Sequence, residues 1–540
     1  MQQQAMTEAA SANRAPIPME CDAPFLKVEG ELPRELNGTL YRNGPNPQFD
    51  VSGAHWFVGD GMLHAFHLEN GRASYRNRWV RTPKWLAEHD AGRALFGGFG
   101  RKLPGSPAGI TDDGGVANTN IIFHAGKLLA LEEGHLPTEI EPGTLNRRGY
   151  CDYKSAIKGP FTAHPKIDPV TGEMVFFGYN AAGPLTPALS FGSVNAAGVV
   201  TRFDRFEAPY ASMVHDFIVT ANHLLFPILP ITGSMERAMR GKAPYAWEPE
   251  KGGYVGVMKR NGSAKDIVWF RAESCYVFHV MNAWEEGNRI IADVMQFEEA
   301  PLFNHPDGSK TDPEKSRARY CRWTFDLAGN TDRFTQTYLD DLTGEFPRID
   351  DRRAGQANSH GWYACANPDL PMFGALSGIV HVDGKGKRLG HYLLPAGDTI
   401  SEPVFVERGA DAAEGDGWLV SAVWRAQENR SDLAVFNAQD VESGPVALVH
   451  LGHRVPDGFH GNWVGAAYMP SGCSSRDINS APISRWTHMA ARPDISSIAT
   501  ISVMIGTYSM KLACARIALR SWRLPLSPNV ARSLCRSRPT

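Results

Sequence analysis

The stretch Thr162-Ala-His-Pro-Lys-Ile-Asp-Pro-Val-Thr-Gly-Glu-Met-Val-Phe-Phe-Gly-Tyr179 contains a histidine, a turn and an apolar run in direct succession. The segment from Asp168 to Gly172 is rich in residues that favour a tight reversal of the chain. The run from Met174 to Phe177 is apolar and has the composition of a buried strand. We therefore predict a β-hairpin with His164 at its inner end.

Three later segments repeat this arrangement of a histidine beside an apolar strand. They are Met213-Val-His-Asp-Phe-Ile-Val-Thr220, Tyr276-Val-Phe-His-Val-Met-Asn-Ala-Trp284 and Gly458-Phe-His-Gly-Asn-Trp-Val464. The chain has 18 histidines, and a single histidine beside a strand is most often a hydrogen-bonded core residue. Together, the four segments indicate a histidine-rich site for a redox metal, formed by His164, His215, His279 and His460.

The composition excludes several classes of protein. A net charge of −3 over 540 residues predicts no nucleic-acid partner. No segment approaches the roughly 18 apolar residues of a membrane-spanning helix, and Met1 to Ile17 lacks the apolar centre of a secretory signal. The eight cysteines include no CxxC pair, so they predict neither a disulfide framework nor a zinc cluster. We expect a cytoplasmic protein.

The middle of the chain, residues 21–466, alternates short apolar runs with turn clusters. This texture is typical of an all-β sandwich, barrel or propeller. Asn70-Gly71 is predicted to be the turn of a hairpin, and helices are expected over Lys84 to Phe96 and Gly233 to Arg240. No repeat of fixed period gives a number of sheets.

The histidine segments also match a family pattern. The matching residues are Ala163-His164-Pro165-Lys166 with Asp168-Pro169 and Thr171-Gly172-Glu173, Val214-His215-Asp216-Phe217, Phe278-His279 with Asn282-Ala283-Trp284-Glu285, and Phe459-His460-Gly461 with Trp463-Val464. On these residues the chain resembles the carotenoid cleavage oxygenases from about Val28 to Val464. The resemblance implies a seven-bladed β-propeller with a dome of helices and loops over an axial iron site. It also implies that the four histidines hold a non-haem Fe(II) and leave positions open for O₂.

The resemblance further implies a layer of carboxylates behind the histidines, which would fix the orientation of the rings. The implied pairs are Glu133 with His215, Glu345 with His279 and Glu402 with His460. His164 would have no such partner. Thr119 matches a threonine that lies near the open iron position in bacterial members, where it would crowd or hydrogen-bond O₂.

Within the family the chain resembles a bacterial branch that cleaves stilbenes and propenyl phenols, near the lignostilbene dioxygenases and isoeugenol monooxygenase. Phe57 matches a phenylalanine that stacks on the substrate in that branch. Two positions depart from it, because Phe99 and Glu132 stand where the branch has a tyrosine and a lysine that bind the phenolic oxygen. A site without those donors should not favour a phenol over its deoxy analogue.

We therefore expect an iron-dependent dioxygenase that cleaves a conjugated C=C bond of a carotenoid or apocarotenoid to two carbonyl products. The alternative substrate is a stilbenoid or phenylpropenoid of the lignostilbene, resveratrol or isoeugenol type. The partners are a small apolar conjugated substrate and O₂. Peripheral membrane contact through Leu225–Ile231 or Phe96–Phe99 stays open, as does the oligomeric state.

Residues 1–20 and 467–540 differ from the middle of the chain. The first region is polar and rich in alanine, and we expect it to be disordered. From Ala466 onward there are ten Lys or Arg against two Asp or Glu, which makes an atypical basic tail that we expect to be poorly ordered. A tail that displaced the last strand would misplace His460, so an inactive, damaged propeller is an alternative hypothesis.

Two other classes of protein are weaker alternatives. A calcium-dependent hydrolase propeller would need oxygen ligands from Asp, Asn and Glu at its axis, and the histidines beside the strands would have no role. A non-catalytic scaffold would leave four histidines and three glutamates unexplained, although a fold alone never implies activity.

Overall fold

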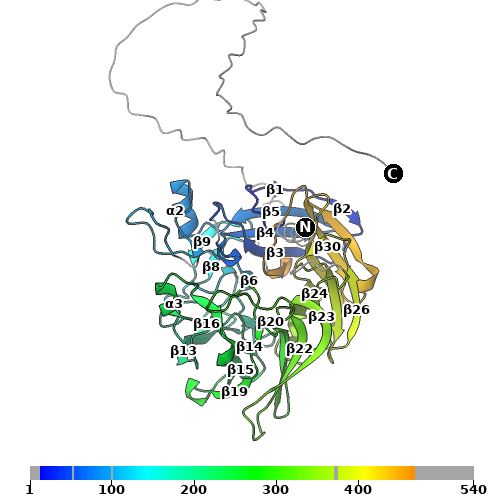
Figure 1. Ribbon diagram of the computed structural model, residues 1–540. Coiled ribbons are helices and arrows are strands. Elements are labelled where there is room, and N and C mark those ends of the chain that lie inside the picture. The colour runs from blue at the N-terminus through cyan, green and yellow to red at the C-terminus, as the bar shows by residue number, and fades with distance from the viewer. Residues whose placement is uncertain (1–12, 52–53, 99–100, 370–374, 469–540) are drawn as a thin grey trace, which may run out of the picture. The chain divides into compact units, whose positions relative to one another are not determined.

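The computed structural model describes residues 13–51, 54–98, 101–369 and 375–468. These residues form mainly antiparallel strands, with two α-helices among the connections (Figure 1). The expected all-β class is confirmed. Most of the two terminal regions, 1–20 and 467–540, lies outside the described residues.

The strands form seven main sheets, numbered here in chain order, of which the fifth and sixth are continuous through the long strand β23. The first sheet contains β3 (Gly38–Pro45), β4 (Gly61–Glu69) and β5 (Arg72–Trp79), with β1 (Asp22–Ala23) at its edge. The second contains β6 (Asn120–His124), β7 (Lys127–Leu131), β8 (Thr138–Ile140) and β9 (Arg147–Tyr150). The third contains β10 (Lys166–Ile167), β11 (Met174–Tyr179), β12 (Ala188–Val194) and β13 (Val200–Glu207).

The remaining four sheets follow the same antiparallel plan. The fourth contains β14 (Ile218–Val219), β15 (His223–Ile228), β18 (Gly253–Lys259) and β19 (Val268–Ala272), with the small pair β16 (Ile231–Gly233) and β17 (Tyr245–Trp247) in a connection. The fifth contains β20 (Tyr276–Glu286), β21 (Arg289–Phe297), β22 (Arg319–Asp326) and part of β23 (Thr335–Ile349). The sixth contains the rest of β23, β24 (His360–Cys365), β25 (Gly378–Asp383) and β26 (Arg388–Leu393). The seventh contains β27 (Thr399–Ile400), β28 (Val404–Glu407), β29 (Gly417–Arg425), β30 (Arg430–Asn437) and β31 (Pro445–His450).

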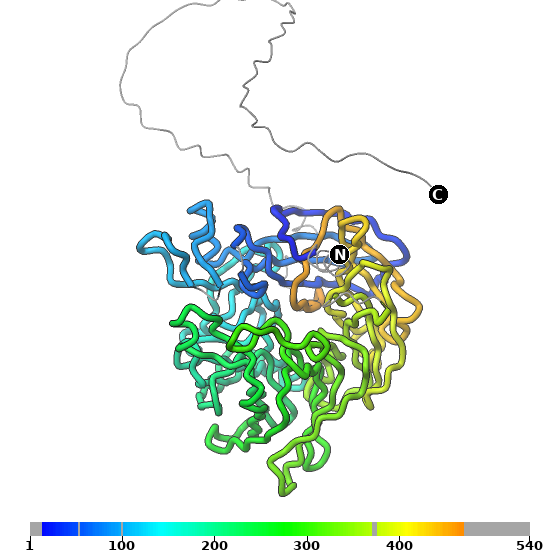
Figure 2. Tube along the Cα trace, in the orientation of Figure 1, coloured from blue at the N-terminus to red at the C-terminus, as the bar shows by residue number. Residues whose placement is uncertain are grey.

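Two strands close the sheets into a ring. Strand β2 (Lys27–Gly30), from the start of the chain, pairs with β31 of the seventh sheet. Strand β32 (Gly461–Gly465), from the other end, pairs with β3 of the first sheet. A Cβ atom at Gly38 would lie 2.5 Å from the Val464 carbonyl oxygen, so glycine permits this close pairing. The colours of Figure 2 follow the sheets around the ring.

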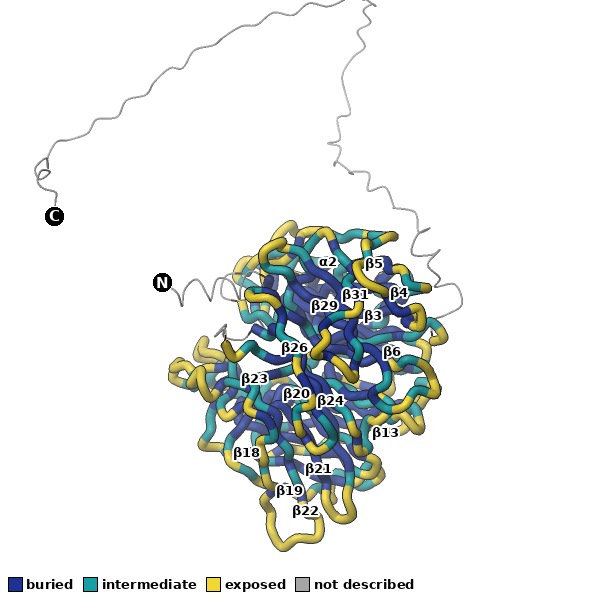
Figure 3. Tube along the Cα trace, turned by 90° about the vertical axis from the view of Figure 1, so that its right-hand side faces the viewer, coloured by how far each residue is buried: buried dark blue, intermediate teal, exposed yellow. Residues whose placement is uncertain are grey.

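The hydrophobic core confirms that the ring is closed. Each sheet shares a buried apolar cluster with the next one along the chain. The closing cluster joins Leu40 and Phe66 of the first sheet to Val420 and Val449 of the seventh. Figure 3 shows the buried residues along the strands and the exposed ones mostly in connections. The protein is therefore the expected seven-bladed β-propeller.

Local sequence signals predicted these hairpins correctly. The predicted hairpin at His164 is present, with Ile167 of β10 opposite Met174 of β11. Asn70 and Gly71 have φ values of 52° and 74°, as a tight turn between β4 and β5 requires. The run Leu225–Ile231, considered above as a membrane-contacting rim, is instead buried in the core.

Both predicted helices are present but shorter than expected. Helix α2 (Pro83–Ala91) ends at Gly92, which adopts the left-handed conformation with φ of 62°. The expected extension to Phe96 is wrong because the Glu88 carboxylate accepts the backbone N–H groups of Leu95 and Phe96 and holds them outside the helix. Helix α3 (Met235–Met239) begins after Ser234, whose hydroxyl caps it.

Candidate metal centre

The fold places each of the four predicted histidines at or beside an edge strand of a different sheet. His164 precedes β10, His215 precedes β14, and His279 lies within β20. His460 directly precedes β32, the strand that closes the ring on the first sheet. Four sheets of the ring thus present these side chains toward one point, although up to 296 positions separate them in the chain (460 − 164).

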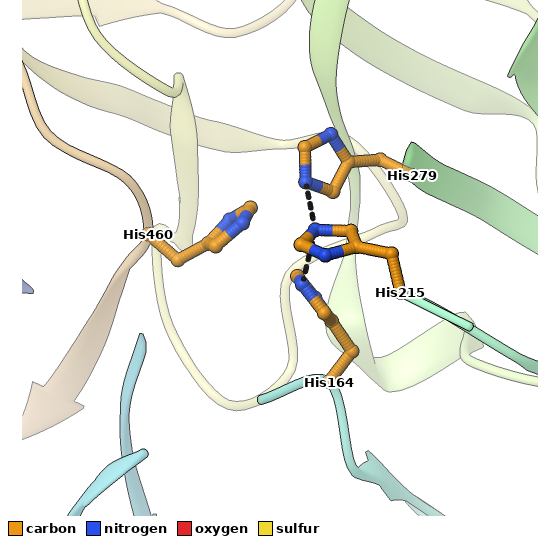
Figure 4. Close-up of side chains that lie close together, drawn as sticks. All are labelled: His164, His215, His279 and His460. Atoms are coloured by element: carbon orange, nitrogen blue, oxygen red, sulfur yellow. Dashed lines mark hydrogen bonds between the residues drawn. The ribbon is translucent and has the colours of Figure 1, made fainter. Parts of the chain in front are cut away.

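The four imidazoles lie together within the ring. Each offers one nitrogen, and these atoms all lie within 4.8 Å of one another. The Nε2 atom of His215 lies 3.0 Å from that of His164 and 3.3 Å from that of His279 (Figure 4). His460 faces the other three from the opposite side of the group. His164, His215 and His460 are buried, and His279 is nearly so.

Three glutamates lie behind this group, in the pairing that the sequence suggested. Glu133 contacts Nδ1 of His215, Glu345 contacts Nδ1 of His279, and Glu402 accepts from Nδ1 of His460 at 3.0 Å. The described residues provide no carboxylate within ion-pair distance of His164. We call the four histidines and these three glutamates the axial centre.

Two further side chains hold the glutamates, and sequence reasoning missed both. The Tyr179 hydroxyl donates to Glu133 at 2.7 Å. The Arg348 guanidinium lies 3.5 Å from Glu402, which also accepts the Gly461 N–H at 2.9 Å. Tyr179 ends the stretch quoted for His164, and Arg348 lies three positions after Glu345, so their nearness to these predicted residues was the available signal.

Burial and charge control the protonation of these groups. Burial and the neighbouring imidazoles lower the pKa of His164 well below its usual value. Burial also lowers the pKa of His460 to about 4, against the opposing effect of Glu402. For His279, burial acts in the same direction, but the Glu345 carboxylate outweighs it and raises the pKa. Arg348 and His460 likewise outweigh burial at Glu402 and lower its pKa to about 2.

The donor set fits a divalent transition metal. A carboxylate that accepts the Nδ1–H of a histidine leaves Nε2 as the nitrogen with a free lone pair. His215 and His279 both have such a carboxylate, and their Nε2 lone pairs, 3.3 Å apart, repel each other unless a cation lies between them. Imidazole suits zinc, copper, iron and nickel, whereas calcium and magnesium prefer oxygen. The geometry therefore favours a metal at the convergence of the four rings.

A cavity of about 1580 Å³ opens onto His215, His279 and His460. Phe57, in a short 3-10 helix (Trp56–Val58), lines it and packs edge-to-face against Phe278 and Phe459. Thr119 also lines it; the Thr119 hydroxyl donates to Asn118, and its carbonyl oxygen accepts the His460 N–H at 3.1 Å. Both predicted pocket residues thus line the cavity that opens onto His215, His279 and His460.

Glu132 lies in the same cavity wall, within a polar group that the sequence did not reveal. Its carboxylate contacts His135 and accepts the Val116 N–H at 3.0 Å. Asp113 and Tyr150 complete this group, which we call the wall cluster (Asp113, Glu132, His135 and Tyr150). Phe99, the other predicted pocket residue, lies outside the described residues.

Comparison with known proteins identifies the family. A family model described as "RPE65: Retinal pigment epithelial membrane protein" matches residues 14–465. Isoeugenol monooxygenase of Pseudomonas putida is 41% identical over 458 residues, covering 83% of this chain and 96% of that protein. Lignostilbene-alpha,beta-dioxygenase isozyme III of Sphingomonas paucimobilis is 36% identical, covering 84% and 96%. The crystal structure of Pseudomonas brassicacearum lignostilbene dioxygenase superposes with a TM-score of 0.79 at 34% identity, covering 83% and 96%.

The chain belongs to the carotenoid cleavage oxygenase family. Its members are non-haem iron oxygenases, and the protein is accordingly an enzyme that cleaves carbon–carbon double bonds. Membership removes the calcium-dependent hydrolase and the non-catalytic scaffold as alternatives. Within the described residues no helix is both long and apolar enough to cross a membrane.

Proposed function

We propose that this protein binds Fe(II) through His164, His215, His279 and His460 and uses O₂ to cleave the side-chain double bond of a phenylpropenoid or stilbenoid to two carbonyl products. The observation that carries the proposal is the convergence of four imidazole nitrogens within 4.8 Å, with three of the four histidines lining an aromatic-walled cavity. The carboxylates behind three of the rings support it, because they keep Nε2 free for a metal.

The substrate class follows from the relatives. The sequence favoured an apocarotenoid, since Phe99 and Glu132 replace a tyrosine and a lysine of the stilbene-cleaving branch. The similar enzymes are named for isoeugenol and lignostilbene, and they match this chain over nearly their whole length. These relatives favour a phenylpropenoid or stilbenoid substrate over a carotenoid. Glu132 also belongs to a polar group in the cavity wall, so the wall around it is not apolar.

The protein's residues would bind and orient the substrate. When bound, ferrous iron would offer open coordination positions at which O₂ is activated. Phe57, Phe278 and Phe459 form an apolar aromatic wall that would hold an aromatic ring with its side-chain double bond toward the histidines. Thr119, beside His460, would narrow the approach to the metal. The cavity would keep bulk water away from the reacting carbons.

Metal analysis and product analysis test this proposal together. Purified full-length chain, loaded with Fe(II), would be given isoeugenol, trans-4-hydroxystilbene and an apocarotenal, in air and without O₂. We expect oxygen-dependent aromatic aldehydes from isoeugenol or the stilbene, detected by chromatography and mass spectrometry. Aldehydes from the apocarotenal alone would overturn the substrate class. Bound zinc or copper, with no iron-dependent activity, would overturn the metal.

The hypothesis of a damaged propeller depends on the closing strand. Strand β32 pairs with β3 from Gly461 to Gly465, directly after His460, which supports an intact centre. A chain ending after Tyr468 keeps every residue of that pairing. We expect it to bind as much iron as the full-length chain; a gain in iron on truncation would instead show that residues 469–540 impair the centre.

A further inference from the structure

The wall cluster consists of linked charges that the chemistry proposed above does not use. Nδ1 of His135 lies 2.8 Å from Oε1 of Glu132, and Nε2 of His135 lies 3.4 Å from Oδ1 of Asp113. The Tyr150 hydroxyl donates to Oδ2 of Asp113 at 2.8 Å. The imidazole is thus held between two carboxylates, one of which is fixed by a tyrosine.

Gly115 shows how closely the oxygens of the cluster converge. A Cβ atom at this position would lie 2.8 Å from the Tyr150 hydroxyl, 2.9 Å from Oε1 of Glu132 and 3.0 Å from Oδ1 of Asp113. Any side chain at Gly115 would therefore displace a member of the cluster. Glycine at position 115 therefore leaves the space in which the four groups pack together.

The cluster carries net negative charge and keeps one acceptor available. Burial lowers the pKa of His135, but Glu132 and Asp113 outweigh burial and raise it to about 9, so the ring is charged at neutral pH. Two carboxylates and one imidazolium leave one excess negative charge. Within the described part of the chain, both contacts of Glu132, with His135 and with the Val116 N–H, use Oε1. Its second oxygen, Oε2, can still accept a hydrogen bond.

Glu132 lies close to the axial centre. It lines the cavity, as does Glu133, the next residue, whose carboxylate contacts His215. Consecutive Cα atoms are about 3.8 Å apart. Because Glu132, His215, His279 and His460 all line this cavity, a substrate bound in it is offered both the Glu132 carboxylate and the histidines.

We propose that the Glu132 carboxylate, held by His135 and the Val116 N–H, accepts a hydrogen bond from a neutral hydroxyl group of the substrate. This inference rests on the proposed function and narrows it to hydroxyl-bearing substrates such as phenols. A cluster with net negative charge favours a donor over a phenolate or carboxylate. A methyl ether cannot donate, so its binding would leave a desolvated carboxylate oxygen unpaired.

The structure reverses the conclusion that the sequence suggested for position 132, where a glutamate replaces a lysine. The loss of a lysine there suggested that the pocket no longer recognises a hydroxyl. The structure instead shows an acceptor fixed in the cavity wall. A neutral phenol can donate as well as accept, so a change from lysine to glutamate reverses the direction of the hydrogen bond and keeps the recognition.

The test compares trans-4-hydroxystilbene with trans-4-methoxystilbene, which differ only in the ability to donate. Affinity would be measured by quenching of tryptophan fluorescence in metal-free protein, and kcat/KM in the iron-loaded enzyme. We expect the wild type to prefer the hydroxystilbene by about 10- to 100-fold in both measurements, as for a hydrogen bond to a charged group. Glu132→Ala should reduce the preference to less than about 3-fold, and Glu132→Gln should keep an intermediate one.

Glu141→Gln is the matched control, because Glu141 pairs with the exposed Arg148 on the same sheet. It should retain the wild-type preference. Thermal melting checks that each variant is folded; if Glu132→Ala is not, Glu132→Gln decides the question, with a clear loss of preference expected.

The outcomes separate this inference from the proposed function. Equal binding of the two stilbenes by the wild type, or an unchanged preference in the Glu132 variants, would overturn the inference whether or not cleavage occurs. A preference in binding that Glu132→Ala removes, without cleavage of either stilbene, would refute the proposed function and support the inference.

Discussion

The axial centre and the wall cluster both contribute residues to the lining of one cavity, but they are built differently. The axial centre takes its histidines from the third, fourth, fifth and first sheets, so the ring itself brings them together. The wall cluster comes from one stretch of chain around the second sheet, between Asp113 and Tyr150. The axial centre thus depends on the whole fold, whereas single substitutions can alter the wall cluster without disturbing the ring of sheets.

Among the substitutions that test this difference, His279→Ala should have the largest effect on iron binding and activity. Three imidazoles cannot replace the fourth ligand, and Glu345 would be left beside an empty position. We expect iron binding and activity to be lost, a larger effect than the ~10- to 100-fold that the loss of an outer carboxylate costs. Metal content after desalting and the rate of aldehyde formation would measure it. A variant with normal iron would mean that three histidines suffice.

Glu402→Gln should have the next largest effect. Glutamine is a weaker acceptor for the Nδ1–H of His460, so iron affinity should fall about 10- to 100-fold. Glu285→Gln is the control, since Glu285 accepts from a histidine outside the centre, His223, at 2.9 Å. Competition with a chelator would give both affinities. Equal losses in the two variants would indicate a general effect on the fold.

Phe57→Leu tests the aromatic part of the cavity lining independently of the axial centre and the wall cluster. The change removes aromatic contacts with Phe278 and Phe459 and leaves the histidines untouched. We expect KM to rise about 10-fold for the hydroxystilbene and the methoxystilbene alike. Iron content should stay normal. A change in the ratio between the two substrates would mean that Phe57 also positions the hydroxyl.

The smallest effect is expected from His135→Gln, measured as stability against pH. The folded pKa of His135, about 9, is above its ordinary value near 6.5. Its ion pairs therefore stabilise the fold fully below about pH 6.5 and lose this contribution as pH rises through about 9. Because the side chain is 33% exposed, we expect a difference in unfolding free energy below about 1 kcal/mol. Urea unfolding at pH 6 and pH 10 would show whether the difference disappears.

The sequence predicted the axial centre better than the wall. Each ligand lies beside a strand with a local signature, as in the stretch around His164, and family motifs supplied the outer glutamates. Asp113 and Tyr150 carry no such signal, because they reach the cluster through loop geometry and tertiary contacts. The end of α2 was missed because Gly92 and the Glu88 carboxylate, rather than apolar periodicity, determine where that helix stops. The number of sheets came from the family resemblance, since no sequence repeat marks it.

The closing strand also has a consequence for how the enzyme is made. Strand β32 is the last described strand to be synthesised, and it pairs with β3, more than 400 positions earlier. Contacts between such distant segments form slowly, because a long loop must close before they give any stabilisation. A nascent chain that has not reached His460 holds three of the four histidines and an open ring. Closure of the ring and completion of the proposed metal site are then a single late step in folding, and iron supplied earlier would meet an incomplete site.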